Sequence, residues 1–177
     1  MEAVGHKGIG YASIEAAVVG IVCLVIGGHV SGWVHDHKGY LDGLWCMISG
    51  LVVLQSLVSD TVKASKERIV GTLVASVLSA LVCMLLGYGY LSIFLSISLS
   101  VYTMNLLKME SGVRIATATV AVIAGYGFIH PEISAWVNAT MRSLDTVIGV
   151  GVGVAAVYLS YRLKIRRAYP VADLSNA

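Results

Sequence analysis

Six long runs of apolar residues constrain this chain more than any other feature of its sequence. The runs cover residues 13–30, 41–58, 65–86, 90–107, 114–129 and 141–163. Each is close to the roughly 20 residues that a helix needs to cross the hydrocarbon core of a bilayer. None alternates with the period of two that barrel strands show. The runs therefore predict helices, in which the backbone satisfies its own hydrogen bonds.

Composition places the chain in a membrane. Of its 177 residues, 57% are hydrophobic and 12% are charged, and the mean hydropathy is +0.82. A soluble fold cannot bury so many apolar groups and still cover itself with polar ones. We therefore predict an all-α polytopic membrane protein with six transmembrane helices. The net charge of +2 says little about partners.

The breaks between the runs carry residues that end helices. Gly87 and Gly89 favour a tight turn after the third run, and Pro131 closes the fifth. The first run follows a short polar start without a small-residue cleavage site, and further runs come after it. We interpret it as a retained helix and not as a signal peptide.

A short repeat divides the six runs into two sets of three. The motif Arg-Ile-Val-Gly-Thr at residues 68–72 opens the third run, and Arg-Ser-Leu-Asp-Thr at residues 142–146 opens the sixth. An odd number of helices between the copies inverts the second copy in a membrane. We predict two inverted three-helix halves, 13–87 and 88–163, and a short basic tail, 164–177. Inverted repeats occur in alternating-access transporters, where substrate binds between the halves.

The positive charges are distributed unevenly over the two faces of the predicted bundle. Only Lys38 and Arg142 fall on the face opposite the termini. The other ten fall on the side that holds both termini: Lys7, Lys63, Lys66, Arg68, Lys108, Arg114, Arg162, Lys164, Arg166 and Arg167. This asymmetry predicts that both termini face the cytoplasm.

The cysteines and histidines predict neither a disulfide framework nor a metal site. Cys23, Cys46 and Cys83 lie inside apolar runs, where free thiols pack as small hydrophobic groups, and three cysteines do not suggest a disulfide framework. His35 and His37 have metal-ligand spacing but no third ligand nearby, so a solvated loop is the favoured interpretation. Since no catalytic constellation, phosphate loop or metal set is evident, we expect neither enzymatic activity nor a cofactor.

Small residues indicate where helices approach closely. The third run repeats them at every fourth position, and the sixth carries a Gly-x-x-x-Gly pair, Gly149 and Gly153. The stripe in the third run consists of Gly71, Ala75, Ser79 and Cys83. Because small side chains let backbones meet, we expect the third and sixth helices to pack together. Two interpretations stay open: these helices can simply pack together, or they can also flank a permeation path.

Hydroxyl groups form a stripe on the fourth run, at Ser92, Ser96, Ser100 and Thr103. Two interpretations stay open. The hydroxyls can bond back to their own helix in a packed face, or they can line a wet path or touch a ligand. Ser96, Ser100 and Thr103 are therefore candidate path residues.

Ionisable groups near the membrane interior are the stronger functional candidates, because a charge deep in lipid costs at least about 2.5 to 3.5 kcal/mol. The basic candidates are Lys63, Arg68, Arg114 and Arg142. Arginines at helix ends can instead extend toward the headgroups without any further role. The carboxylates nearest the interior are Glu15 and Asp145, which are the candidate proton carriers if transport is coupled to protons.

Four segments of the sequence resemble one protein family. Residues 48–55 (Ile-Ser-Gly-Leu-Val-Val-Leu-Gln) and 59–73 (Ser-Asp-Thr-Val-Lys-Ala-Ser-Lys-Glu-Arg-Ile-Val-Gly-Thr-Leu) resemble the signature of the aromatic acid exporter family, which belongs with the fusaric acid resistance proteins. The likeness continues through residues 108–113 (Lys-Met-Glu-Ser-Gly-Val) and 142–149 (Arg-Ser-Leu-Asp-Thr-Val-Ile-Gly) and covers nearly the whole chain. The plant aluminium-activated malate transporters, which are dimeric anion channels, are more distantly similar.

The resemblance implies a six-helix unit of the bacterial inner membrane that exports organic anions, typically aromatic carboxylates. Larger relatives carry two such units with cytoplasmic domains, and exporters of this kind work with a periplasmic adaptor subunit. Only residues 164–177 follow the last run here. We therefore expect no cytoplasmic domain, and a homodimer or a higher homo-oligomer.

These expectations combine into a mechanism. An organic anion is drawn from the cytoplasm by Lys63, Arg68 and Arg114 and leaves past Arg142. Three functions stay open: an active exporter, an anion channel of the malate-channel type, and a scaffold subunit of a larger efflux assembly. The basic residues 162–167 favour an anchor beside anionic lipids over a nucleic-acid contact.

Overall fold

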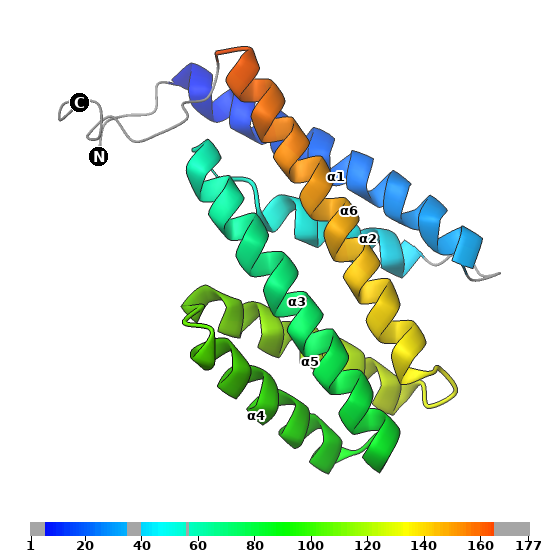
Figure 1. Ribbon diagram of the computed structural model, residues 1–177. Coiled ribbons are helices and arrows are strands. Elements are labelled where there is room, and N and C mark those ends of the chain that lie inside the picture. The colour runs from blue at the N-terminus through cyan, green and yellow to red at the C-terminus, as the bar shows by residue number, and fades with distance from the viewer. Residues whose placement is uncertain (1–5, 35–39, 56, 165–177) are drawn as a thin grey trace. The chain divides into compact units, whose positions relative to one another are not determined.

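The computed structural model describes residues 6–34, 40–55 and 57–164, and helices dominate this part of the chain (Figure 1). The six helices are α1 (His6–Val34), α2 (Tyr40–Val52), α3 (Val58–Leu86), α4 (Tyr90–Leu106), α5 (Glu110–Ile129) and α6 (Ala135–Arg162). The described residues contain no strand. The predicted all-α class is confirmed.

Four helices of the described chain are long and apolar enough to cross a membrane. These segments are Gly10–Val30, Val58–Leu86, Glu110–Ile129 and Ala135–Arg162. At a rise of 1.5 Å per residue, the 13 residues of α2 extend about 20 Å and the 17 residues of α4 about 26 Å, less than a hydrocarbon core of about 30 Å. The inverted arrangement of six full spans therefore stays a prediction.

Large apolar side chains face outward along these helices. Ile14, Leu85 and Phe94 are 66%, 82% and 65% exposed, respectively. Water would disfavour such surfaces, whereas lipid tails solvate them. The exposed side chains support a membrane environment for the helices that carry them.

Several predicted helix boundaries differ from the structure, and two of them lie between α2 and α3. The run 41–58 was expected to be one helix, but α2 ends at Val52, where the Leu54 N–H bonds back to the Leu51 carbonyl in a turn. The Thr61 hydroxyl accepts a hydrogen bond from the Gln55 N–H and donates to the Leu57 carbonyl. These bonds satisfy backbone groups between the helices, so α3 begins at Val58, seven residues before its predicted start.

The described chain forms two compact units. Unit 1 contains α1, α2, the first residues of α3 and the second part of α6, and unit 2 contains most of α3, α4, α5 and the first part of α6. The boundaries fall inside two continuous helices, after Ser65 in α3 and after Thr146 in α6. Each unit thus combines two helices joined by a short connection with part of a long helix from elsewhere in the chain.

Gly50 of α2 lets the helices of unit 1 approach one another closely. A side chain at Gly50 of α2 would lie 2.6 Å from Cys23 Sγ of α1 and 3.0 Å from the Gly149 carbonyl of α6. Gly50 therefore marks the place where all three helices approach most closely. Val19 packs beside it with Cys23 and Cys46 in a buried cluster.

The core of unit 2 consists mainly of small and aliphatic side chains from all four of its helices. Met104 of α4 and Ile123 of α5 are the largest buried side chains of the cluster. Its smaller members are Ala75, Ala80, Cys83, Ala116, Val120, Ala124, Ala135 and Ala139. Figure 1 shows α4 and α5 lying side by side, in line with the packing between these helices.

A tight connection joins α4 to α5. Lys108 adopts a left-handed backbone conformation with φ of 55°, and its N–H bonds to the Asn105 carbonyl, while the Met109 N–H bonds to the Met104 carbonyl. These two bonds form a Schellman motif, which usually carries glycine at the left-handed position. Gly112 then lets Met104 and Met109 pack against the start of α5.

Each glycine stripe faces a shorter helix, whereas the expected contact between α3 and α6 is made inside unit 2 by Thr72 and Thr146. Gly71 of α3 faces α5, where a side chain would lie 3.1 Å from the Gly112 carbonyl. Gly149 and Gly153 of α6 face α2, where a side chain at Gly153 would lie 2.7 Å from the Gly50 carbonyl. A small residue permits close approach to any neighbouring helix. In the structure, the glycine of α3 faces α5, and the glycines of the Gly-x-x-x-Gly pair of α6 face α2.

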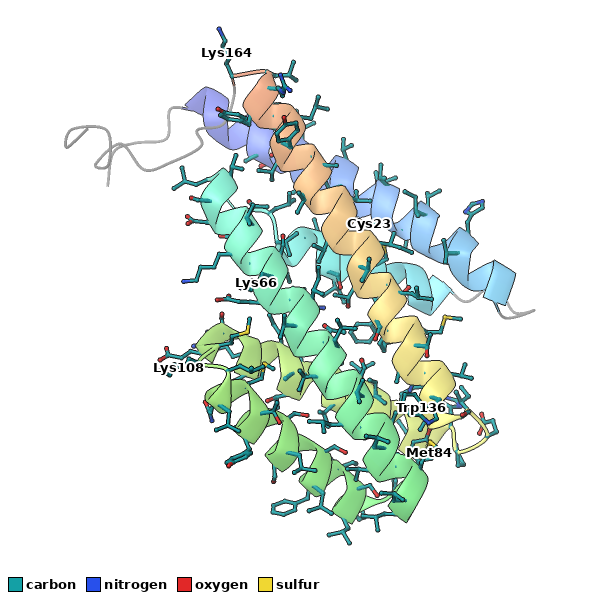
Figure 2. The ribbon with its side chains drawn as sticks, viewed as in Figure 1. Cys23, Lys66, Met84, Lys108, Trp136 and Lys164 are labelled. Atoms are coloured by element: carbon teal, nitrogen blue, oxygen red, sulfur yellow. The ribbon has the colours of Figure 1, made fainter. Side chains whose placement is uncertain are left out.

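The labelled side chains of unit 2 lie at its two ends (Figure 2). Lys66 and Lys108 lie at one end, and Met84 and Trp136 lie at the other. Lys66 and Lys108, two of the cations that were assigned to one membrane face, thus lie at the same end of this unit. Which end faces the cytoplasm stays a prediction.

Candidate functional site

A buried ion pair on α6 is the strongest candidate site. The Arg142 guanidinium lies 3.3 Å from the Asp145 carboxylate, and the side chains are 10% and 5% exposed. The residues are three apart in the helix, so their side chains meet on one face. α6 begins at Ala135, two turns before Arg142, and therefore carries the pair inside a candidate membrane span.

The two copies of the sequence repeat meet beside this pair. The Thr146 hydroxyl lies 3.5 Å from the Thr72 hydroxyl of α3, and both side chains are buried. Thr72 and Thr146 occupy equivalent positions in the two copies. This contact joins α3 to α6 inside unit 2.

Asn138 extends the polar face of α6 toward its start. Its amide donates to the Ile123 carbonyl of α5 at 3.2 Å and is buried. Asn138, Arg142 and Thr146 recur at every fourth position, which places them on one side of the helix. Asn138 was not among the predicted site residues, because the helix was expected to start at residue 141 and it starts at Ala135. The four-residue spacing back from Arg142 was the signal that could have revealed it.

The remaining basic candidates are less buried than Arg142. Arg68 is half-buried on α3, one turn before Thr72. Lys63 and Arg114 are exposed, and Lys63 belongs to unit 1 whereas Arg114 belongs to unit 2. Of the four basic candidates, only Arg142 is buried.

Most of the hydroxyl stripe of α4 lies on a buried face of that helix. Ser92, Ser96 and Ser100 are at most 1% exposed, whereas Thr103 is half-buried and donates to the Leu99 carbonyl. Ser92 donates to the Gly87 carbonyl. In the described part of unit 2, four buried hydroxyls have no hydrogen-bond partner: Ser76 and Ser79 of α3, and Ser96 and Ser100 of α4.

Those four hydroxyls carry an energetic cost. A buried hydroxyl without a partner costs about 1 to 3 kcal/mol, and such groups are normally satisfied by water or a ligand. The packed-face interpretation therefore explains the burial of the stripe, and the polar-path interpretation explains why Ser96 and Ser100 lack protein partners.

A second polar cluster lies in unit 1. Glu15 of α1 is 7% exposed, and the Ser160 hydroxyl of α6 lies 2.6 Å from its Oε1 atom. The Tyr11 hydroxyl lies 2.9 Å from the same Ser160 Oγ. Glu15 was a predicted site residue, but its two hydroxyl neighbours were not. Nothing in the local pattern around Ser160 indicates that α1 lies against it.

These contacts also orient the helices of unit 1. Tyr11 and Glu15 lie near the start of α1, whereas Ser160 lies near the end of α6. The two helices therefore run antiparallel, and the first turns of α1 lie beside the last turns of α6.

Thiols and histidines supply no metal centre in the described residues. No group of three or more His, Cys, Asp or Glu side chains there could hold a metal ion. Cys23, Cys46 and Cys83 are buried in the apolar clusters of the two units. His35 and His37 lie outside the described residues.

The connection between α3 and α4 contains a tyrosine with a perturbed pKa. Burial, and secondarily the nearby charge of Cys83, raise the pKa of Tyr88 above its ordinary value. The Tyr88 hydroxyl donates to the Ile133 carbonyl at 2.8 Å, and its ring fills the space left by the missing side chain of Gly127. Tyr88 thus ties the two connections at this end of unit 2 together.

Comparison with known proteins identifies one family. A family model described as fusaric acid resistance protein-like matches residues 23–156, well over half of the chain. No curated protein and no solved structure matches the chain. The matched region includes Arg68, Arg142 and Asp145 but begins after Glu15 and ends before Ser160.

Proposed function

The chain belongs to the fusaric acid resistance protein-like family, and from that membership we propose that it is a membrane transporter that exports organic anions, with aromatic carboxylates as the substrate class. The family and the long apolar helices support a transport role in a membrane. The substrate class follows from the resemblance to the aromatic acid exporters, and the guanidinium of Arg142 supports an anion as the substrate.

The observation that carries the proposal is the buried pair of Arg142 and Asp145 inside a candidate span. A guanidinium presents a planar set of donors that matches a carboxylate. Asp145 provides such a carboxylate within the protein. A substrate carboxylate can replace it as the partner of Arg142, so that Arg142 keeps a negative partner in both states.

Neutral polar groups flank the pair on the same helix face. The Asn138 amide lies one turn before Arg142, and the Thr146 hydroxyl lies one turn after it. Such groups can orient a bound anion without adding a second charge that would hold it too tightly. This arrangement suits a substrate with one carboxylate.

The route and the assembly belong to the same proposal. Lys63, Arg68 and Arg114 attract anions at the cytoplasmic mouth, and the anion leaves past Arg142 on the outer side. Both termini face the cytoplasm of a bacterial inner membrane. The working unit is a homodimer or a higher homo-oligomer, with a periplasmic adaptor subunit as a further partner.

An anion channel is the second candidate. Ser76, Ser79, Ser96 and Ser100 favour it, because buried hydroxyls without protein partners are suited to a continuous polar path. A channel needs such a path but no coupling residue. A scaffold subunit of a larger efflux assembly needs neither.

One pair of measurements separates these functions. The purified protein is placed in proteoliposomes for counterflow of labelled benzoate, and in planar bilayers for voltage-driven current. Counterflow without current supports the exporter, and current supports the channel. Absence of both, together with stable binding to another protein, contradicts the transport proposal and favours the scaffold.

A further inference from the structure

Two buried serines of α3 carry hydroxyl groups that bond to no other protein group. Ser76 and Ser79 are 2% and 0% exposed, respectively, and neither hydroxyl has a hydrogen-bond partner. Hydroxyls in a helix can donate to the carbonyl one turn back, as Ser143 of α6 and Thr119 of α5 do in the same unit. A buried hydroxyl normally has a partner, so the O–H groups of Ser76 and Ser79 are donors suited to a ligand.

Two contacts within unit 2 fix the direction of α3 relative to α6. The Thr72 hydroxyl of α3 lies 3.5 Å from the Thr146 hydroxyl of α6. Just after α3, the Tyr88 hydroxyl donates to the carbonyl of Ile133, which lies just before α6. The later part of α3 therefore runs antiparallel to the first part of α6. Figure 2 agrees, because the labelled residues near the end of α3 and near the start of α6 lie at the same end of the unit.

This antiparallel register places the two serines at the level of Arg142. Ser76 follows Thr72 by four residues and Ser79 follows it by seven, so the serines lie on the face of α3 that meets α6 at Thr72. Arg142 precedes Thr146 by four residues on α6. One turn forward along α3 corresponds to one turn back along α6, because the helices run in opposite directions. Ser76 is therefore level with Arg142, and Ser79 lies nearly one turn further along.

The apolar residues beyond this stretch support the register. Ala80 and Cys83 of α3 share a buried cluster with Ala135 and Ala139 of α6. Toward the end of α3, the two helices thus meet through small apolar side chains. The polar groups of both helices are confined to the stretch nearer Thr72, which makes that stretch the place for a polar ligand.

Hydroxyl groups at the level of a guanidinium suit an anion. The Arg142 guanidinium contains donors and no acceptor, and a serine O–H without an acceptor adds another donor. Asp145 lies 3.3 Å from Arg142, so a substrate carboxylate must compete with a carboxylate that is already in place. A carboxylate that enters the membrane loses water, and hydroxyl donors can replace part of its hydration. Neutral donors do this without adding a charge that would hold the anion too tightly.

We propose that Ser76 and Ser79 complete an anion-binding site with Arg142, in which the two hydroxyls donate to the carboxylate group of the substrate. This inference rests on the proposed transport function for the physiological role of the site, whereas binding of a carboxylate can be measured separately. The three residues belong to unit 2 and to the region that the family model matches.

Equilibrium binding of labelled benzoate to the purified protein in lipid nanodiscs tests the site. The double variant S76A/S79A should bind benzoate at least about tenfold more weakly than wild type, because two hydrogen bonds to a charged group are lost. The control S143A removes a hydroxyl that is bonded to its own helix, and its affinity should stay within about twofold of wild type. Equal affinities of S76A/S79A and wild type overturn the inference, and so does a wild type that binds no benzoate.

Stability separates a ligand site from a merely packed face. Without benzoate, S76A/S79A should resist SDS unfolding at least as well as wild type, because alanine removes buried hydroxyls that have no protein partner. Added benzoate should stabilise wild type more than the double variant, since a ligand stabilises the folded state that binds it. Equal stabilisation of the two proteins by benzoate contradicts the assignment.

Counterflow in proteoliposomes assigns the role of the site in transport. S76A/S79A should raise the KM for benzoate by about tenfold and leave the maximal rate within about twofold of wild type. An unchanged KM contradicts a binding role for the serines. If wild type binds benzoate but shows no counterflow, the transport proposal fails, and the binding result still decides whether Ser76 and Ser79 hold the anion.

Discussion

At the scale of single residues, Arg142 and Asp145 differ from the exposed candidate charges in their burial. Lys63 and Arg114 are exposed, where water screens them, whereas the Arg142–Asp145 pair is almost completely buried. In a buried site each charge depends on the other. The pair is therefore both a stabilising contact and a place where an external carboxylate can compete.

This dependence predicts the effects of neutralising the pair. R142Q or D145N alone should lower the free energy of unfolding by about 3 to 5 kcal/mol, because each leaves a buried charge without its partner. The double variant R142Q/D145N should lose much less than the sum. Unfolding by SDS in mixed micelles, followed by circular dichroism, measures all three. R114Q is the exposed control, and additive losses in the double variant would count against an energetic pair.

Tyr88 predicts a dependence on alkaline pH. Its folded-state pKa is raised, so the folded protein holds the phenolic proton more tightly than the unfolded chain. The resulting stabilisation is complete below the unfolded-state value of about 10 and is lost as pH rises through the folded-state value. The difference in unfolding free energy between wild type and Y88F should shrink over that range. The exposed Y102F is the control, and a difference independent of pH contradicts the prediction.

At the scale of helices, the surroundings of each glycine show whether helix packing requires it. Gly149 and Gly151 are neighbours on α6 with the same side chain. A side chain at Gly149 would collide with the Cys46 carbonyl and lie 2.9 Å from the Gly50 backbone nitrogen. A side chain at Gly151 would have nothing within 4 Å. Only the first glycine is required by the contact with α2.

Alanine at these two glycines should therefore have opposite effects. G149A should destabilise the protein by about 1 to 3 kcal/mol, because the helices must separate to admit the methyl group. G151A should leave stability unchanged or raise it slightly, because alanine favours helix. SDS unfolding of both variants provides the comparison. Equal losses at the two positions would rule out the close approach of α2 and α6.

The helices themselves were predictable from apolar runs and turn residues. The runs predicted the α-helical class, and Pro131 marked the end of α5, which stops at Ile129. The partners of the helices were not predictable in the same way, because small residues permit close contact without selecting a neighbour. Gly71 proved to face α5, and Ser160 proved to face Glu15, through contacts between distant segments of the chain.

At the scale of the whole molecule, we propose that the chain is one transporting unit of a symmetric assembly. We predict a homodimer, because larger proteins of the family that the sequence resembles carry two six-helix units. A homodimer supplies the second unit without further sequence. The exposed apolar surfaces of the helices are compatible with lipid and with a second copy.

Crosslinking in native membranes tests this assembly. A dimer should appear at low crosslinker concentration and persist when the protein is diluted into mild detergent with lipid. A monomer under both conditions contradicts the predicted homodimer.

The central claim is that Arg142 handles the transported anion. The most direct test is benzoate counterflow by the R142Q/D145N variant in proteoliposomes, because this variant is expected to fold without a buried unpaired charge. We expect at least a tenfold loss of counterflow relative to wild type, with R114Q reduced much less. Counterflow at the wild-type rate in the folded double variant would contradict the claim.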